Sequence, residues 1–145
     1  MTERGGQNVT YLEKLDLGFN KLQNLPTEIS LLINLKHLSL RHNKLTTLPE
    51  EIGALTRLNY LNLNHNELQS IPENFCKLTQ LKQLLFYKNK LVRLPEDIGE
   101  LILVENVNLA ANNLQTLPDS VKMMTKIKQL NLSRNNIRDF PVQIC

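Results

Sequence analysis

The sequence predicts an α/β fold of the solenoid type, a curved right-handed coil in which about six copies of one short unit stack side by side. Two observations lead to this prediction. A pattern of leucines returns every 23 residues, and all six prolines of the chain occupy the same place in that pattern. Self-similarity at a fixed period of roughly 20 to 50 residues is typical of repeat architectures, in which each unit covers the apolar face of the next one.

We number the repeat from Leu12, which takes position 1. The repeat extends over residues 12–145 as one domain, and its sixth copy is incomplete. Residues 1–11 are then an N-terminal flank or the remnant of a preceding repeat. No polar terminal turn covers the C-terminal end, so we expect either a longer protein or a last turn that frays. The six copies begin at Leu12, Leu35, Leu58, Leu81, Val104 and Ile127.

Each copy is predicted to begin with a short β-strand. Apolar side chains stand at positions 1, 4 and 6, for example Leu35, Leu38 and Leu40, and the last two show the two-residue alternation of a strand with one buried face. One strand of this length is not stable alone, so we expect the six to pair as one parallel sheet on the concave side of the coil. Residues of one column across this sheet should lie about 5 Å apart.

An asparagine follows each predicted strand at position 9. Its side chain carries both a hydrogen-bond donor and an acceptor, and it stands where the chain turns away from the sheet and backbone groups need partners. We therefore predict a ladder of asparagine side chains that bond the loop backbone of their own turn and of the adjacent turn. The six members are Asn20, Asn43, Asn66, Asn89, Asn112 and Asn135.

Position 15 is proline in every copy, and acidic residues follow it closely, for example Glu50-Glu51 and Asp119. Proline suits the first turn of a helix, and acidic side chains are favoured at that end. Gly53 and Gly99 would weaken a long helix. We predict a short α-helical or 3₁₀ segment on the convex side of each turn.

The composition is that of a globular chain, with 41% hydrophobic residues, 21% charged residues and a net charge of +3. Basic and acidic residues are interspersed, which gives only weak support for nucleic acid and none for a membrane surface, so we expect neither nucleic acid nor a membrane span. No apolar run approaches the roughly 18 residues that a membrane span needs. The polar start, MTERGGQNVT, lacks the apolar stretch of a secretory signal.

The two cysteines, Cys76 and Cys145, are three repeats apart in the same phase of the pattern. Stacking at about 4.8 Å per strand separates their Cα atoms by roughly 14 Å, whereas a disulfide tolerates at most about 7 Å. Two unpaired thiols predict a reducing, intracellular location, the cytoplasm.

The repeated pattern LxxLxLxxNxLxxLPxxIxxLxx closely resembles the leucine-rich repeat family. Its LP-x-x-I/F/V limb is similar to that of an intracellular subclass typified by Ras-suppressor and Ras-scaffold proteins. The resemblance implies a solenoid whose concave face binds a protein partner, with a small GTPase or a phosphatase subunit as the leading expectations. Val104, Val107, Ile127, Phe86 and Phe140 depart from the pattern conservatively and leave the expected fold unchanged.

The central repeats carry residues on the concave side that are typical of protein interfaces. Aromatic and arginine side chains surrounded by polar groups supply most of the binding energy at such interfaces. We predict a partner site on the outward positions of repeats two to four, around the apolar or amphipathic Tyr60, Leu85 and Tyr87. The alternative is ordinary surface variation, since isolated exposed apolar residues are normal. The predicted site comprises His37, Arg41, His42, Tyr60, Asn62, Asn64, His65, Leu85, Tyr87 and Lys88.

Ile102 and Leu103 stand where other repeats have polar residues. A contact for weak self-association is one interpretation of this apolar pair, and local packing against Val104 and Ile127 is the favoured one. We otherwise expect a monomer.

No catalytic, cofactor or metal site is predicted. His42 and His65 share a column, but His37 lies roughly 16 Å along the strand from His42, which leaves zinc short of its three or four ligands. The chain has no glycine-rich phosphate loop, Gly-x-Ser-x-Gly elbow or HExxH motif.

We therefore expect a non-enzymatic scaffold or adaptor that binds another protein, and the resemblance suggests Ras-type GTPase signalling. The competing interpretation is a regulatory or targeting segment of a larger signalling enzyme, such as a kinase, a cyclase or a ubiquitin ligase. Ligand recognition outside the cell is disfavoured, because cysteine caps and a secretory signal are missing.

Overall fold

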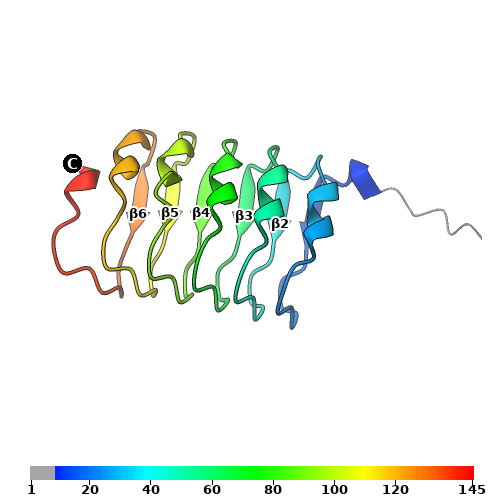
Figure 1. The fold of residues 1–145 in the computed structure, drawn as a ribbon, viewed down its shortest axis with the longest axis horizontal. Coiled ribbons are helices and arrows are strands. Elements are labelled where there is room, and N and C mark those ends of the chain that lie inside the picture. Colours follow the sequence, from blue (N-terminus) through cyan, green and yellow to red (C-terminus); the bar gives the residue numbers. More distant parts are fainter. Residues whose placement is uncertain (1–8) are drawn as a thin grey trace, which may run out of the picture.

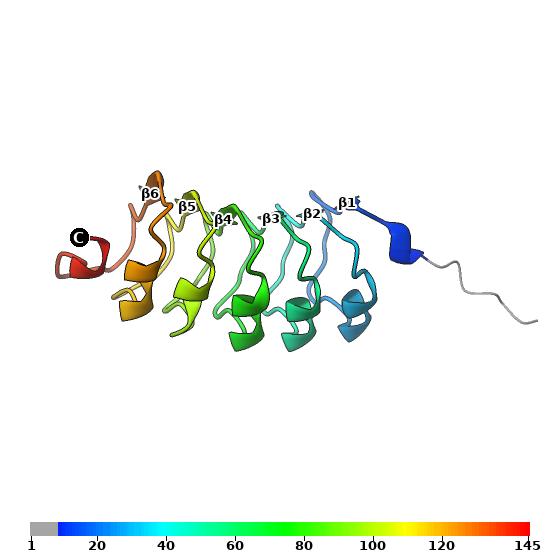
Figure 2. The same ribbon diagram turned by 90° about the horizontal axis from the view of Figure 1, so that it is seen from above.

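The fold is an elongated stack of turns with one sheet along its length (Figure 1), seen in a computed structural model that describes residues 9–145. Six strands form this sheet in the order β1-β2-β3-β4-β5-β6, so neighbours in the sequence are also neighbours in space. The helical segments line the opposite side, and the stack curves gently with the strands on its inner face (Figure 2). The predicted α/β solenoid is confirmed. Of the predicted N-terminal flank, residues 1–8 lie outside the described residues.

Each strand is three residues long and occupies positions 3 to 5 of its repeat, and adjacent strands pair in parallel, for example Leu38 with Leu61. Backbone pairing continues past the strands. The Leu17 N–H donates to the Ser39 carbonyl at 2.9 Å, and the Phe19 N–H donates to the Arg41 carbonyl at 2.9 Å. The sheet-like ladder therefore reaches the turn at position 8. The strands are β1 (Lys14–Asp16), β2 (His37–Ser39), β3 (Tyr60–Asn62), β4 (Gln83–Leu85), β5 (Asn106–Asn108) and β6 (Gln129–Asn131).

The convex segments are 3₁₀ helices of three to five residues, one of the two alternatives that the sequence left open. The prediction that proline lies within the first helical turn is wrong by one residue. Pro49 precedes η3 with an extended backbone (φ −70°, ψ 151°), and its carbonyl accepts the first helical hydrogen bond from the Ile52 N–H at 3.1 Å. The helices are η1 (Val9–Tyr11), η2 (Thr27–Leu31), η3 (Glu50–Ala54), η4 (Glu73–Lys77), η5 (Ile98–Glu100), η6 (Asp119–Met123) and η7 (Val142–Ile144).

Two glycines allow the convex segments to approach one another closely. A Cβ atom on Gly53 would collide with the carbonyl oxygen of Asn74 in η4, and one on Gly99 would collide with the carbonyl oxygen of Ser120 in η6. Glycine is therefore required at these positions by the spacing between turns.

Leucines fill the space between the sheet and the helices. Leu35, Leu58 and Leu81, which begin successive repeats, are completely buried. Phe75 and Phe86 meet edge to face in the middle of this core, with ring centroids 5.6 Å apart. In the outer turns, the corresponding apolar side chains pack against the core but stay partly exposed; these are Leu12, Leu15, Leu17, Leu22, Leu32, Ile127, Leu130 and Leu132.

Both cysteines are free, as their spacing predicted. Cys76 is buried in η4, and burial raises the pKa of its thiol to about 12. Cys145 is exposed at the end of η7.

Candidate protein-binding face

The register of the sheet places residues of the same position side by side on the concave face. His37 pairs with Tyr60 in the parallel ladder, and their rings stack with centroids 4.1 Å apart and planes 6° apart. The Tyr60 hydroxyl accepts a hydrogen bond from Asn62 Nδ2 at 3.0 Å. The phenol of Tyr60 therefore lies along its strand, over the inner face of the sheet.

A second set of rings runs across the first four repeats where the strands end. We call Phe19, His42, His65 and Tyr87 the ring column. Phe19 and His42 stack at 4.3 Å between centroids, His42 and His65 stack at 4.0 Å, and His65 meets Tyr87 nearly at a right angle at 5.1 Å. These separations match the spacing of the strands beneath, so the sheet sets the geometry of the column.

An unusual backbone conformation aligns the ring column. Every residue at position 8 has a positive φ, including His42 at 54° and His65 at 56°. This left-handed conformation costs a non-glycine residue about 1–2 kcal/mol. It is held by hydrogen bonds to the next repeat, such as that from the His65 N–H to the Tyr87 carbonyl at 2.7 Å. The other members of this left-handed set are Phe19, Lys88, Ala111 and Arg134.

The asparagine side chains at position 9 stabilise this turn through hydrogen bonds to backbone groups. The Oδ1 atom of Asn66 accepts the Leu45 N–H at 3.1 Å, and its Nδ2 atom donates to the carbonyls of Leu40 at 2.9 Å and Leu63 at 3.2 Å. Asn43, Asn89, Asn112 and Asn135 make the same set of bonds. Among the described residues, the side chain of Asn20 donates to the carbonyls of Leu17 and Gly18, both in its own turn.

Two asparagines of the predicted partner site accept hydrogen bonds from backbone N–H groups of other residues in that site. Asn62 Oδ1 accepts the Asn64 N–H at 3.0 Å, and Asn64 Oδ1 accepts the Tyr87 N–H at 2.7 Å. Asn64 thereby links the third repeat to the turn that carries Tyr87.

Charged side chains flank the rings. The Arg41 guanidinium lies 5.2 Å from the centroid of Phe19, a cation–π distance. The Gly18 N–H donates to Asp16 Oδ1 at 2.8 Å, and this bond lowers the pKa of the Asp16 carboxyl. Desolvation lowers the pKa of His65, and the nearby His42 and Lys88 lower it further.

The residues of the predicted site differ in how much surface they offer. Arg41 and Lys88 are exposed, and the rings and Asn64 are half-buried. The expectation that Leu85 is an outward apolar anchor does not hold, because its side chain is only 8% exposed between Asn62 and Asn108 in the sheet register. Asn62 is similarly covered, at 7%. The half-buried rings of the predicted site are His37, His42, Tyr60, His65 and Tyr87.

The sequence-based prediction missed Phe19. This side chain is 67% exposed and forms the first ring of the column. The available signal was its position, because Phe19 occupies position 8 together with His42 and His65. Restricting the site to repeats two to four excluded it.

Ile102, one of the two candidate residues for self-association, is 50% exposed, and its neighbour Leu103 is half-buried. The adjacent Val104 is fully buried and belongs to the core. The pair therefore presents one apolar side chain to solvent, away from the ring column.

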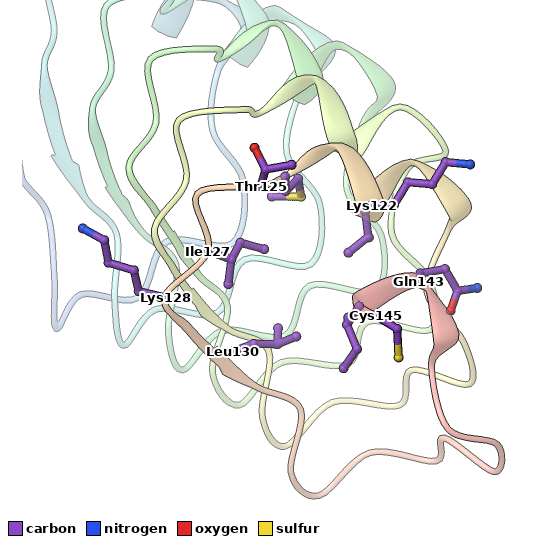
Figure 3. A pocket seen from close by; sticks show the side chains of 10 residues that line it. Lys122, Thr125, Ile127, Lys128, Leu130, Gln143 and Cys145 are labelled. Atoms are coloured by element: carbon purple, nitrogen blue, oxygen red, sulfur yellow. The ribbon is translucent and has the colours of Figure 1, made fainter.

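A pocket of about 470 Å³ lies at the C-terminal end of the stack, between η6, β6 and η7 (Figure 3). Ile127 and Leu130 line its inner wall, and Gln143 and Cys145 lie opposite. It is a gap between the last two turns and includes no residue of the ring column.

Two further properties concern residues 9–145 only. No group of three or more histidine, cysteine, aspartate or glutamate side chains in this range is arranged to hold a metal ion. No helix in the same range is long and apolar enough to cross a membrane.

The chain matches the leucine-rich repeat region family over residues 7–131. It is similar to the solved structure of a leucine-rich repeat protein of Leptospira interrogans, with 29% identity, a TM-score of 0.67, and coverage of 93% of this chain and 52% of that one. An internalin of Listeria monocytogenes is 27% identical, with a TM-score of 0.80 and coverage of 90% of this chain and 37% of that one. The PEPR1–AtPEP1 structure is 30% identical, with a TM-score of 0.79 and coverage of 87% of this chain and 18% of that one. The chain thus spans about half or less of each of these proteins. No curated protein matches it.

The stacked turns, the single parallel sheet and the asparagine ladder define a solenoid repeat protein. This chain belongs to the leucine-rich repeat family. Members of this family are in general non-enzymatic modules for protein–protein interaction.

Proposed function

We propose that this chain binds another protein through the concave face of repeats one to four, with the ring column at the centre of the contact. The observation that supports this most directly is the ring column itself. Four rings in a row, with Phe19 67% exposed at one end and Arg41 beside it, place the residue types of interface hot spots on one surface.

The geometry also reduces the cost of binding. Each ring is held by its neighbours and by a backbone turn that the asparagine ladder fixes. Side chains that are ordered before a partner arrives lose little conformational freedom on association. His37, Tyr60, Asn64 and Lys88 extend this surface, while Asn62 and Leu85 lie beneath it.

The resemblance to Ras-suppressor and Ras-scaffold proteins leads us to place this binding in cytoplasmic signal transduction. A small GTPase of the Ras type is the first candidate partner, and a phosphatase subunit is the second. Surface plasmon resonance with a purified Ras-type GTPase tests the first candidate directly. Binding of the GTP-loaded form to this chain supports the candidate, and equal absence of binding in the GTP- and GDP-loaded forms removes it.

A second proposal is that this repeat segment regulates or targets a larger signalling enzyme. The three similar structures support only the part of this proposal that concerns length, because in each of them the matching part belongs to a longer chain. A transcript that encodes a kinase, cyclase or ubiquitin-ligase domain in frame with this segment would support it. Transcripts that all end at Cys145 would exclude it.

Affinity capture with matched variants tests the concave site. The parent chain, the double variant Phe19→Ala, Tyr87→Ala and the control Tyr11→Ala, Leu31→Ala are compared as baits. Tyr11 and Leu31 are 83% and 61% exposed and lie outside the ring column, so the control removes comparable apolar surface elsewhere. Loss of an interface aromatic typically weakens binding by about tenfold or more.

We expect a specific partner to be retained by the parent and the control and lost by the ring-column variant, with all three giving the same circular dichroism spectrum. A partner retained equally by all three baits places the contact elsewhere. Ile102 and Leu103 are then the next surface to test, by sedimentation of an Ile102→Thr, Leu103→Lys variant across a range of concentrations.

A further inference from the structure

Charge is divided unevenly between the two sides of the solenoid. The convex helices η2 to η6 contain six acidic residues and two lysines, Lys77 and Lys122. The acidic ones are Glu28, Glu50, Glu51, Glu73, Glu100 and Asp119. The convex side is therefore acidic along most of its length.

The concave face of repeats one to four has the opposite sign. Lys14, Arg41 and Lys88 are exposed there, and Asp16 is the one carboxylate at positions 3 to 8 of these repeats. The side chain of Asp16 already accepts the Gly18 N–H. Basic residues thus outnumber acidic ones on the surface that carries the ring column.

Acidic residues beside the strands, two in repeats one to four and Glu105 in repeat five, are paired with lysines. Glu13, Glu67 and Glu105 each pair with a lysine of the following repeat, at 3.1, 3.1 and 2.9 Å. None of these three ion pairs, which are those found in residues 9–145, includes Lys14, Arg41 or Lys88. Arg41 contacts Phe19 and interacts electrostatically with Asp16, yet it is exposed, as are Lys14 and Lys88, so all three cations can be reached by a partner.

The orientation of the rings determines which of their atoms a partner can contact. His42 has Phe19 stacked on one side and His65 on the other, with planes within 13° of parallel. The solvent therefore meets ring edges of the column: the edge of Phe19 carries partial positive charge, and the edges of His42 and His65 present ring nitrogens that can form hydrogen bonds. Because the inner ring faces are occupied, the column gives the bases of a nucleic acid few faces on which to stack.

We propose that the concave face of repeats one to four recognises an acidic segment of a partner protein, one in which Asp or Glu residues flank an aromatic or aliphatic side chain. The carboxylates meet Arg41 and Lys88, and the apolar side chain packs on Phe19 and the edges of the ring column. This inference rests on the proposed function and adds the chemistry of the partner.

A random peptide library displayed on phage tests the proposal without a known partner. Peptides of roughly 12 residues are long enough to cross four strands at about 4.8 Å each. The library is selected on the parent chain, and the affinities of the selected peptides are then measured for the variant Arg41→Glu, Lys88→Glu and for the control Lys77→Glu, Lys122→Glu. The two variants change the net charge equally, one on the concave face and the other on the convex helices.

We expect selected peptides rich in Asp and Glu next to an apolar residue. The concave variant should bind them about tenfold more weakly or worse, and the convex control should bind them like the parent. Raising the salt from about 50 to about 300 mM should weaken binding to the parent and have less effect on the concave variant.

Peptides without acidic enrichment, no binding peptides at all, or equal weakening by both variants would overturn the proposal. Tighter binding of a single-stranded nucleic acid of equal charge would also overturn it. The variant Phe19→Ala, Tyr87→Ala distinguishes failure of the acidic specificity from failure of the proposed binding site itself. If selected peptides depend on these two rings but not on Arg41 and Lys88, the concave site stands and the acidic specificity falls.

Discussion

The imidazole rings of His42 and His65 stack face to face, with centroids 4.0 Å apart and planes 13° apart. Two positively charged rings at this distance repel one another, so the stack favours a state in which at least one of them is neutral. Desolvation is the largest cause that lowers the pKa of His65 from the ordinary 6.5, and the nearby His42 and Lys88 lower it further.

The first prediction concerns this histidine pair. NMR titration should give His65 a pKa below 6.5, and the variant His42→Gln should raise that pKa without restoring the ordinary value, because desolvation is its largest cause. The unfolded chain binds a proton at His65 more readily than the folded one, so stability should decline as the pH falls below about 6.5. An unchanged His65 titration in His42→Gln would show that the two rings are not electrostatically coupled.

The second prediction concerns the asparagine ladder. Asn66→Ala removes bonds to the backbone of Leu45, Leu40 and Leu63 and should lower the free energy of unfolding by about 1–3 kcal/mol or more. Asn20→Ala is the matched control, because Asn20 is exposed and, within residues 9–145, its side chain donates to carbonyls of its own turn. Chemical denaturation measures both. Equal losses in the two variants would contradict the role of bonding between turns.

The third prediction tests the left-handed turn at position 8. Ala111 has φ 56°, so Ala111→Gly should raise the stability by about 0.5–1 kcal/mol through relief of this strain. Ala54 is exposed in η3 and has no positive φ, so the same substitution there should change the stability in the opposite direction. Ala54→Gly should lower the stability by about 0.5–1 kcal/mol. Thermal melts of the two variants and the parent measure both changes in stability. A lower melting temperature for Ala111→Gly than for the parent would contradict the strain at position 8.

The fourth prediction concerns the contact between convex segments. Gly99→Ala places a methyl group against the backbone carbonyl of Ser120, which cannot move without shifting η6. A loss of about 1–3 kcal/mol or more is expected. Gly18→Ala is a milder insertion, because its new Cβ would meet mainly side-chain atoms, Asp16 Oδ1 at 3.0 Å and Arg41 Cγ at 3.2 Å. A Gly99→Ala midpoint equal to that of the parent would mean that the turns separate freely.

The fifth prediction concerns the thiols. Cys76 is buried with a pKa raised to about 12, so at about pH 8 almost none of it is thiolate, which is the reactive form. Alkylation of the native chain should modify the exposed Cys145 and leave Cys76 intact until the chain is denatured. Peptide mapping by mass spectrometry reads both sites, and rapid native labelling of Cys76 would indicate frequent opening near η4.

Much of the fold follows from the period of the sequence. Apolar residues at fixed positions require a core shared between turns, and the columns at positions 3 and 5 are the ones that the observed register pairs, as in His37 with Tyr60. The bonds of Asn66 are also of the kind that its donor and acceptor groups suggested.

The alignment of repeat positions places Phe19, His42 and His65 together at position 8, but it does not predict the whole ring column. Position 8 holds residues as different as Phe19, Lys88 and Ala111, so no glycine or asparagine signals the left-handed backbone that they share. Tyr87 stands at position 7 and meets His65 at position 8, a contact that crosses the columns. The covering of Leu85 likewise depends on how its neighbours in the sheet lie over it, which residue spacing does not specify.

The strand order has a mechanical consequence, because within residues 9–145 the strands pair only with those directly beside them. Pulling on the two ends of the chain should therefore unfold it sequentially, one turn after another. Each released turn of 23 residues would lengthen the molecule by roughly 70–80 Å. A partner bound across β1 to β4 would connect four turns. In a force–extension trace, its presence should therefore raise the force at which these four turns unfold and leave the unfolding of the other turns unchanged.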